Sequence, residues 1–232
     1  MLWQFTTWHF ECLTQFSALL RDPVYQGSQA PYGKGEPVLL IPGFMAGDWT
    51  LLAMARWLSR IGYRPYLSGI DWNVGAPERT AQLLAWRLDH IVKETGAPVI
   101  IVGHSLGGIL GRFLGAQFPE SICAVVALGS PLHDPLRGTH PLVRFAFNSL
   151  QALWRLFGYA LPDQGVFHSV AFPLPETVEF TAIFSKDDEI VDWRSCLDAD
   201  GDNREVSGRH VSLIVNREVY HILAQTLASC SR

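Results

Sequence analysis

The chain has 232 residues, of which 48% are hydrophobic and 17% are charged, and its formal net charge is −4 at pH 7. This length and composition fit one globular domain with a large core, and we predict that it spans residues 1–232. The mild negative charge gives no electrostatic argument for a nucleic-acid partner.

The N-terminal segment, residues 1–23, differs from a signal peptide. It has no Lys or Arg before Arg21, and polar residues such as Gln4, His9 and Glu11 interrupt its apolar positions. Nowhere does the chain contain the apolar run of about 18 residues that a transmembrane helix requires. We expect an amphipathic helix packed on the domain; the alternative is peripheral contact with a lipid surface.

The cysteines give no sign of a metal site or a disulfide framework. They are scattered along the chain without a C-x-x-C pair, at Cys12, Cys123, Cys196 and Cys230. Because disulfide-poor chains are typical of reducing compartments, we predict a cytoplasmic protein.

The middle of the chain alternates between short apolar runs and helical patterns. The apolar runs predict strands at 36–43, 63–69, 98–105, 122–131 and 178–185, and the helical patterns fall at 48–62, 76–96, after 105 and at 216–229. Asp48 is the expected N-cap of the first of these helices. Continuously apolar strands are typical of a parallel sheet that is covered on both faces. We therefore predict a doubly wound α/β fold, in which ligands bind at the carboxyl ends of the strands.

Residues 132–176 interrupt this alternation with a long segment that has no strand pattern, which we interpret as a helical cap or lid insertion. Its helical part has one narrow polar stripe, and the rest of its circumference is apolar. A helix that is apolar over so wide an arc is expected to bury most of its surface. It either caps the core or forms a lid that lines a substrate pocket or meets lipid, and Phe147 and Trp154 are candidate pocket residues.

The sequence Gly103-His104-Ser105-Leu106-Gly107 fits the pattern G-x-S-x-G between a predicted strand and a predicted helix. In this context the serine lies on a sharp turn that exposes its hydroxyl, and small neighbours allow the turn. The next N–H group, that of Leu106, opens a helix and can stabilise an oxyanion. We therefore predict that Ser105 is a nucleophile.

Glycines continue along this predicted helix at every fourth position, at Gly107, Gly111 and Gly115. They share one helical face, and each costs about 0.5–1 kcal/mol of helix stability relative to alanine. Such a stripe indicates that this face lies very close to the sheet or to a neighbouring helix.

With this strand–turn–helix pattern around Ser105, the chain from about residue 36 onward resembles the α/β-hydrolase superfamily. It is most similar to lipase and esterase members in which the nucleophile turn, called the nucleophile elbow, has a GHSLGG-type sequence. The resemblance implies an α/β-hydrolase fold and a triad ordered nucleophile, acid, histidine along the chain. The acid and the histidine should then each follow a later strand.

The segment after the strand at 178–185 offers three acids. Alignment of Ser185 and the apolar pair after Glu189 with the family pattern selects Asp188 as the triad acid, with Asp187 as the alternative. Asp192 is expected to cap a helix. The histidine that the resemblance selects is His210, after a short strand-like piece; the rival, His221, lies inside the last predicted helix.

The resemblance also places a second oxyanion donor in the loop at 41–47. The family often has histidine where this chain has Pro42, so one family hydrogen bond is missing. The expected donor is the backbone N–H of Phe44, with that of Met45 as the alternative. The side chains of Phe44 and Met45 would line an apolar pocket.

These residues favour a carboxylic ester hydrolase that works through an acyl-enzyme on a small-molecule or lipid ester with an apolar acyl chain. No cofactor and no metal are expected. An acyltransferase, thioesterase or amidase would use the same triad, and a non-catalytic binding module would predict a degraded one. The sequence carries no signal for the oligomeric state.

Overall fold

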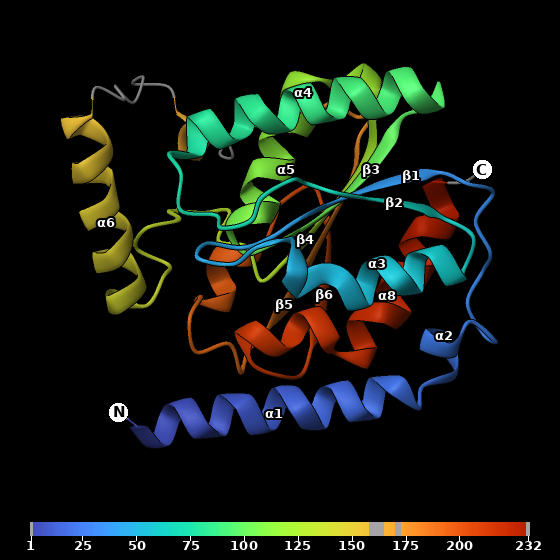
Figure 1. Ribbon diagram of the computed structural model, residues 1–232, viewed down its shortest axis with the longest axis horizontal. Coiled ribbons are helices and arrows are strands. Elements are labelled where there is room, and N and C mark those ends of the chain that lie inside the picture. Colours follow the sequence, from blue (N-terminus) through green and yellow to red (C-terminus); the bar gives the residue numbers. More distant parts are fainter. Residues whose placement is uncertain (1, 158–164, 170–172, 231–232) are drawn as a thin grey trace.

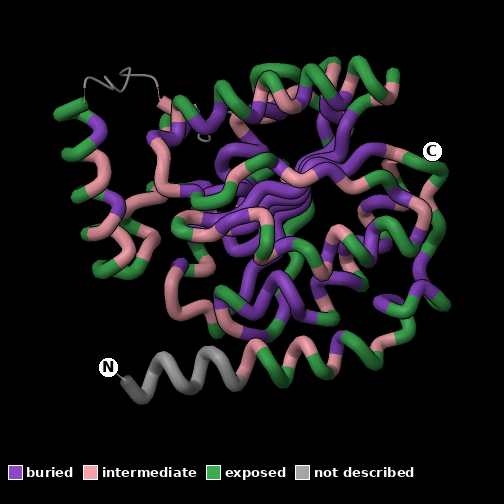
Figure 2. Tube along the Cα trace, viewed as in Figure 1, coloured by how far each residue is buried: buried purple, intermediate pink, exposed green. Residues whose placement is uncertain are grey.

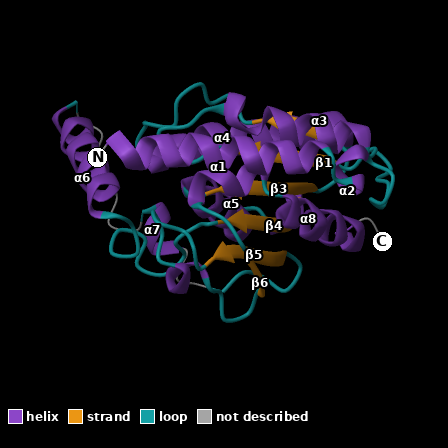
Figure 3. Cartoon of the chain, turned by 90° about the horizontal axis from the view of Figure 1, so that it is seen from below, coloured by secondary structure: helices purple, strands orange, loops and turns teal. Residues whose placement is uncertain are grey.

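A computed structural model describes residues 2–157, 165–169 and 173–230. Within them, six parallel strands form one sheet in the order β2-β1-β3-β4-β5-β6. The strands are β1 (Pro37–Ile41), β2 (Arg64–Leu67), β3 (Val99–His104), β4 (Ile122–Leu128), β5 (Glu179–Ser185) and β6 (Asp202–Val206). Figure 3 shows β1, β3, β4, β5 and β6 stacked in this order. The predicted parallel α/β architecture is confirmed.

Helices cover both faces of the sheet (Figure 1). One face carries α3 (Leu52–Arg60) and α8 (Arg217–Cys230), with α1 (Leu2–Leu20) and α2 (Pro23–Gln26) beside them. The other face carries α4 (Pro77–Thr95), α5 (Leu106–Gln117) and α7 (Val166–Ser169). The remaining helix α6 (Pro141–Leu156) stands at one end of the sheet, and short 3-10 turns lie at η1 (Asp48–Leu51), η2 (Pro119–Ser121), η3 (Trp193–Cys196) and η4 (His210–Val215).

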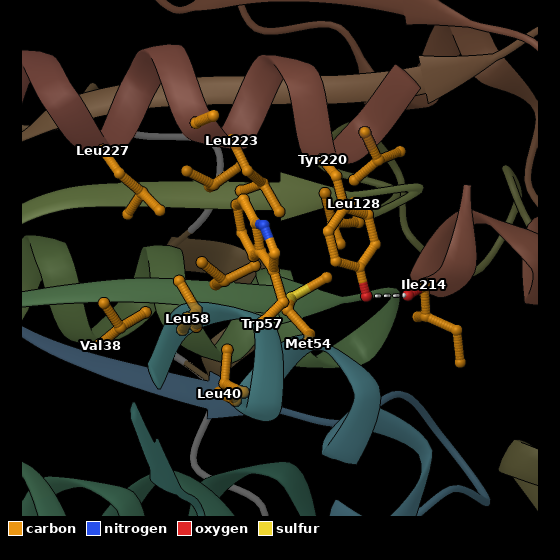
Figure 4. Packing of buried hydrophobic residues seen from close by; sticks show 14 of the residues in the cluster. Val38, Leu40, Met54, Trp57, Leu58, Leu128, Ile214, Tyr220, Leu223 and Leu227 are labelled. Carbon is orange, nitrogen blue, oxygen red and sulfur yellow. Dashed lines mark hydrogen bonds between the residues drawn. The ribbon is translucent and has the colours of Figure 1, made fainter. Parts of the chain in front are cut away.

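The core has two layers because alternate residues of each strand point to opposite faces. Val38 and Leu40 belong to the cluster under α3 and α8, whereas Leu39 and Ile41 belong to the cluster under α4 and α5. In the first cluster, the fully buried Trp57 packs among leucine and methionine side chains (Figure 4). The four central strands β1, β3, β4 and β5 are almost continuously buried (Figure 2), which explains their apolar sequences.

Two expectations about local structure are wrong. Asp48 does not cap the helix that follows it: the N-cap is Gly47, and the Asp48 carboxylate accepts hydrogen bonds from Ser68 and Gly69 instead. The helix in the 132–176 segment also does not bury most of its surface. The exposed fractions of Leu142, Phe145, Leu156 and Phe157 lie between 64% and 83%.

Candidate active site

The predicted site residues follow the carboxyl ends of four strands in the described sheet. The Phe44 loop follows β1, Ser105 follows β3, Asp188 follows β5, and His210 follows β6 at the start of η4. Because all strands are parallel, these ends lie at one edge of the sheet. The helix α6 stands at the same edge (Figure 1).

Ser105 occupies a strained turn between β3 and α5. Its φ of 53° and ψ of −120° lie outside the regions that residues with a side chain normally adopt, which costs on the order of 1–3 kcal/mol. The turn is compact enough to require glycine nearby. A Cβ atom on Gly103 would lie 2.3 Å from the Gly107 carbonyl, and one on Gly107 would lie 2.2 Å from the Ile41 oxygen.

The glycine stripe on α5 does bring this helix close to the sheet, as predicted. A Cβ atom on Gly111 would lie 2.8 Å from the Ile101 Cγ2 atom, and one on Gly115 would lie 3.2 Å from the Val125 Cγ2 atom. The helix begins at Leu106, directly after Ser105, and its first N–H groups have no intrahelical acceptor.

Asp188 and His210 form a buried pair, with 2.6 Å between Asp188 Oδ2 and His210 Nδ1. The other carboxylate oxygen accepts hydrogen bonds from the backbone N–H groups of Ile190 (2.8 Å) and Val191 (2.7 Å). These bonds leave the carboxylate only one orientation. Among the described residues the Ser105 hydroxyl has no hydrogen-bond partner, and catalytic contacts of this kind are often long in unliganded enzymes.

His104 lies beneath this pair. Its ring centroid is 4.8 Å from that of His210, and its Nε2 atom is 3.1 Å from the His210 carbonyl oxygen. Burial, together with the nearby charge of His210, lowers the pKa of His104 to about 3. The ring is therefore neutral at pH 7, and since the carbonyl can only accept, Nε2 carries the proton.

The rival residues have other partners. Asp187 is exposed, and its backbone N–H binds the Ser185 hydroxyl. His221, on α8, has its Nε2 atom 3.0 Å from the carboxylate of Asp22, the residue just before α2. Asp192 caps η3 through the N–H of Arg194, as expected.

Two backbone N–H groups near Ser105 are free to bind an oxyanion. The Phe44 N–H has no acceptor among the described residues, and the Leu106 N–H belongs to the first residue of α5. The alternative donor, the Met45 N–H, is already bound to the Asn73 carbonyl oxygen at 3.0 Å. The geometry therefore favours Phe44 over Met45.

A small apolar cavity of about 50 Å³ adjoins the turn that carries Ser105. Its walls include Phe44, Ser105, Val143 and Phe147. Phe147 contacts Phe44 edge to face, with ring centroids 5.4 Å apart. Trp154 does not line this cavity but packs behind Phe147, with ring centroids 5.7 Å apart.

A larger groove of about 1050 Å³ lies beside this cavity. Val143 lines both spaces, so the groove and the small cavity share a wall. The exposed side chain of Met45 lines the groove rather than the small cavity. Carboxylates of Glu11 and Asp187 also line the groove, so its surface combines apolar and acidic groups.

Sequence reasoning missed the residue that braces the His210 loop. Glu11, on α1, accepts hydrogen bonds from the Arg209 N–H (3.0 Å) and from the Ser212 hydroxyl (3.3 Å), and it pairs with the Arg209 guanidinium at 2.9 Å. In the sequence it only interrupts an apolar run. The described residues include no group of three or more His, Cys, Asp or Glu side chains that could hold a metal ion.

Two curated relatives match 105 residues, or 41% of the chain, at 30% identity. They are the triacylglycerol lipases of Pseudarthrobacter phenanthrenivorans and Burkholderia plantarii, of which the matches cover 33% and 29%. The chain thus matches about a third of the length of these relatives.

Solved structures support the fold over most of the chain. The mature Bacillus licheniformis lipase BlEst2 superposes with a TM-score of 0.61 at 16% identity, covering 86% of this chain and 94% of that one. A soluble variant of Saccharomyces cerevisiae monoglyceride lipase gives 0.59 at 16% identity, covering 88% and 91%. The sequence profile described as the alpha/beta hydrolase family matches residues 38–223. The chain belongs to the alpha/beta hydrolase family.

Proposed function

We propose that the protein is a carboxylic ester hydrolase with Ser105 as nucleophile, His210 as general base and Asp188 as the acid that orients it. The observation that carries this proposal is the 2.6 Å contact of His210 with Asp188, together with a serine on a strained turn whose neighbour His104 lies against His210. The partial match to two triacylglycerol lipases supports the reaction class.

In this mechanism Asp188 accepts a hydrogen bond from the Nδ1–H group of His210, so that Nε2 is free to take the proton of Ser105. The serine oxygen attacks the ester carbonyl, and the N–H groups of Phe44 and Leu106 stabilise the oxyanion. His210 then protonates the leaving alcohol, and an acyl-enzyme remains. Water activated by His210 releases the acid. The scheme needs no metal or cofactor.

The walls of the site support an ester with an apolar acyl chain, either a small molecule or a lipid. The small cavity beside Ser105 is lined by Phe44, Ile109 and Phe147. The adjoining groove is large enough for a longer substituent. Apolar walls favour apolar ligands because binding removes their surface from water.

We further propose that residues 132–176, of which 158–164 and 170–172 lie outside the described residues, form the cap of a single domain, and that the cap contacts lipid surfaces. The outer face of α6 is apolar and exposed at Leu142, Phe145, Leu156 and Phe157. A patch of this kind on a protein surface is typical of an interaction site. Among the described residues no helix is both long and apolar enough to cross a bilayer, and cytoplasmic location stays a prediction.

The test is hydrolysis of p-nitrophenyl esters of increasing chain length by the wild type and by Ser105→Ala. We expect Ser105→Ala to lose at least about 10³-fold in kcat/KM, and a fluorophosphonate probe to label only the wild type. Wild-type protein that neither cleaves any of these esters nor reacts with the probe would contradict the proposal. Competing alcohols in the same assay reveal acyl transfer if ester products accumulate.

A further inference from the structure

One residue outside the proposed triad holds the loop that carries the Phe44 N–H. Asn73, in the segment between β2 and α4, binds this loop three times. Its side-chain Nδ2 donates to the Pro42 carbonyl (2.8 Å), its backbone N–H donates to the Ala46 carbonyl (2.7 Å), and its own carbonyl accepts the Met45 N–H (3.0 Å).

These contacts flank Phe44 on both sides. The amide side chain of Asn73 fixes the peptide unit before Gly43, and its backbone fixes the residues after Phe44. Met45 is held with a φ of 58°, in the left-handed region that a residue with a side chain rarely adopts. Because the Asn73 carbonyl accepts the Met45 N–H, Phe44 supplies the one of the two candidate donors that has no acceptor among the described residues.

The loop is also pressed against the nucleophile turn. A Cβ atom on Gly43 would lie 3.1 Å from the Ser105 Cβ atom and 3.2 Å from the His104 carbonyl oxygen. A small displacement of the Pro42–Gly43 segment therefore changes the position of the Phe44 N–H relative to the atom that Ser105 would attack. Oxyanion donors depend steeply on such placement.

The environment of Asn73 favours a role in positioning the Phe44 loop over a role in overall stability. The residue is only 1% exposed, and its Oδ1 atom has no hydrogen-bond partner among the described residues. A buried amide that leaves its oxygen unpaired is a poor source of stability. Its Nδ2 group, however, supplies the loop with the one side-chain hydrogen bond to the Pro42 carbonyl.

We infer that Asn73 is a positioning residue that sets the Phe44 N–H in the oxyanion hole. This inference rests on the proposed ester hydrolase function. Because Pro42 has no backbone N–H, only its carbonyl can form a backbone hydrogen bond. The side-chain amide of Asn73 supplies the donor for that carbonyl. The sequence pattern alone does not single out Asn73.

The test compares wild type with Asn73→Ala and Asn73→Leu. Alanine removes the amide, and leucine keeps a similar volume without a donor. We expect kcat for a p-nitrophenyl ester to fall about 10- to 100-fold with KM within about twofold, since the donor acts mainly on the transition state. The affinity for a boronic acid transition-state analogue should fall by the same factor as kcat/KM.

The matched control is Asn203→Ala. Asn203 also donates its side-chain amide to backbone carbonyls, those of Asp198 (2.6 Å) and Gly201 (3.1 Å), in a loop remote from Phe44. The Asn203→Ala variant should have a lower melting temperature than the wild type and an unchanged kcat. Asn73 variants that lose melting temperature but keep wild-type kcat and boronic acid affinity would overturn the inference, as would a raised KM with unchanged kcat. A wild type without Ser105-dependent activity would instead overturn the proposed function itself.

Discussion

Replacement of Asp188 by asparagine is the sharpest test of the proposed triad. In the native protein, Asp188 Oδ1 accepts hydrogen bonds from the backbone N–H groups of Ile190 (2.8 Å) and Val191 (2.7 Å), and Asp188 Oδ2 contacts His210 Nδ1 at 2.6 Å. An asparagine must keep its carbonyl oxygen toward the two N–H donors. Its NH₂ group then faces Nδ1, which forces the proton of His210 onto Nε2, where it can no longer accept the proton of Ser105.

We therefore expect Asp188→Asn to lower kcat by about 10³- to 10⁴-fold, which is about 4–5.5 kcal/mol in the activation free energy. KM should change little, because the Asp188 side chain is buried behind His210 and does not line either cavity. The assay is steady-state hydrolysis of a p-nitrophenyl ester, with circular dichroism to verify folding.

Asp187→Asn is the matched control, since it makes the same chemical change one residue away on an exposed side chain. It should keep kcat for a short p-nitrophenyl ester within about twofold, because Asp187 lines the outer groove and not the small cavity beside Ser105. A folded Asp188→Asn variant that retains a tenth of wild-type kcat, or a large loss in Asp187→Asn, would refute the reasoning.

The remaining predictions concern pH, packing and substrate size. The folded-state pKa of His104 is about 3 and its unfolded value is about 6.5, so the unfolded chain binds more protons between these pH values. The free energy of unfolding should therefore fall as pH falls from about 6.5 to about 3, by up to about 1.4 kcal/mol per pH unit from this group. Urea titrations should show a smaller loss for His104→Gln than for the wild type. Gly111→Ala gains up to about 1 kcal/mol of helix propensity but overpacks against Ile101 at about 1–3 kcal/mol, so the urea midpoint should drop rather than rise. Phe147→Ala enlarges the small cavity and should raise the ratio of kcat/KM for long against short acyl esters several-fold, whereas Phe145→Ala on the exposed side of α6 should leave that ratio unchanged. An unchanged ratio in both variants would show that this cavity does not receive the acyl chain.

Features encoded in neighbouring residues could be predicted from the sequence. The tight turn at Ser105 and the glycine stripe are local patterns, and the contacts of Gly107 and Gly111 agree with them. The strand β6 (Asp202–Val206) lies at the sheet edge, and only Val206 in it is buried, so its sequence has no apolar run and gave only a strand-like hint before His210.

Features that depend on distant contacts could not be predicted. Asp187 and Asp188 are adjacent, and what separates them is the position of His210 and of the N–H groups that follow. Trp154 has the same helical phase as Phe147, but seven residues add about 10 Å along a helix, which carries it past the cavity. The N-cap expected of Asp48 failed because Ser68 and Gly69 offer its carboxylate more donors than the helix start does.

The two N–H groups proposed for the oxyanion hole lie just after two neighbouring strands, β1 and β3, which pair with Ile41 opposite Gly103. The distance between the two N–H groups depends on how closely the loop after β1 packs against the start of α5. Both segments have glycine at this contact, Gly43 in the loop and Gly107 in the helix. A Cβ atom on Gly107 would meet the Ile41 oxygen at 2.2 Å, and one on Gly43 would meet the Ser105 Cβ atom at 3.1 Å. Any side chain at Gly107 therefore pushes the backbone of β1 away from α5 and separates the two donors, so activity and stability fall together there. Farther along α5, Gly111 faces only the side chains of the sheet, and a substitution there acts on stability alone.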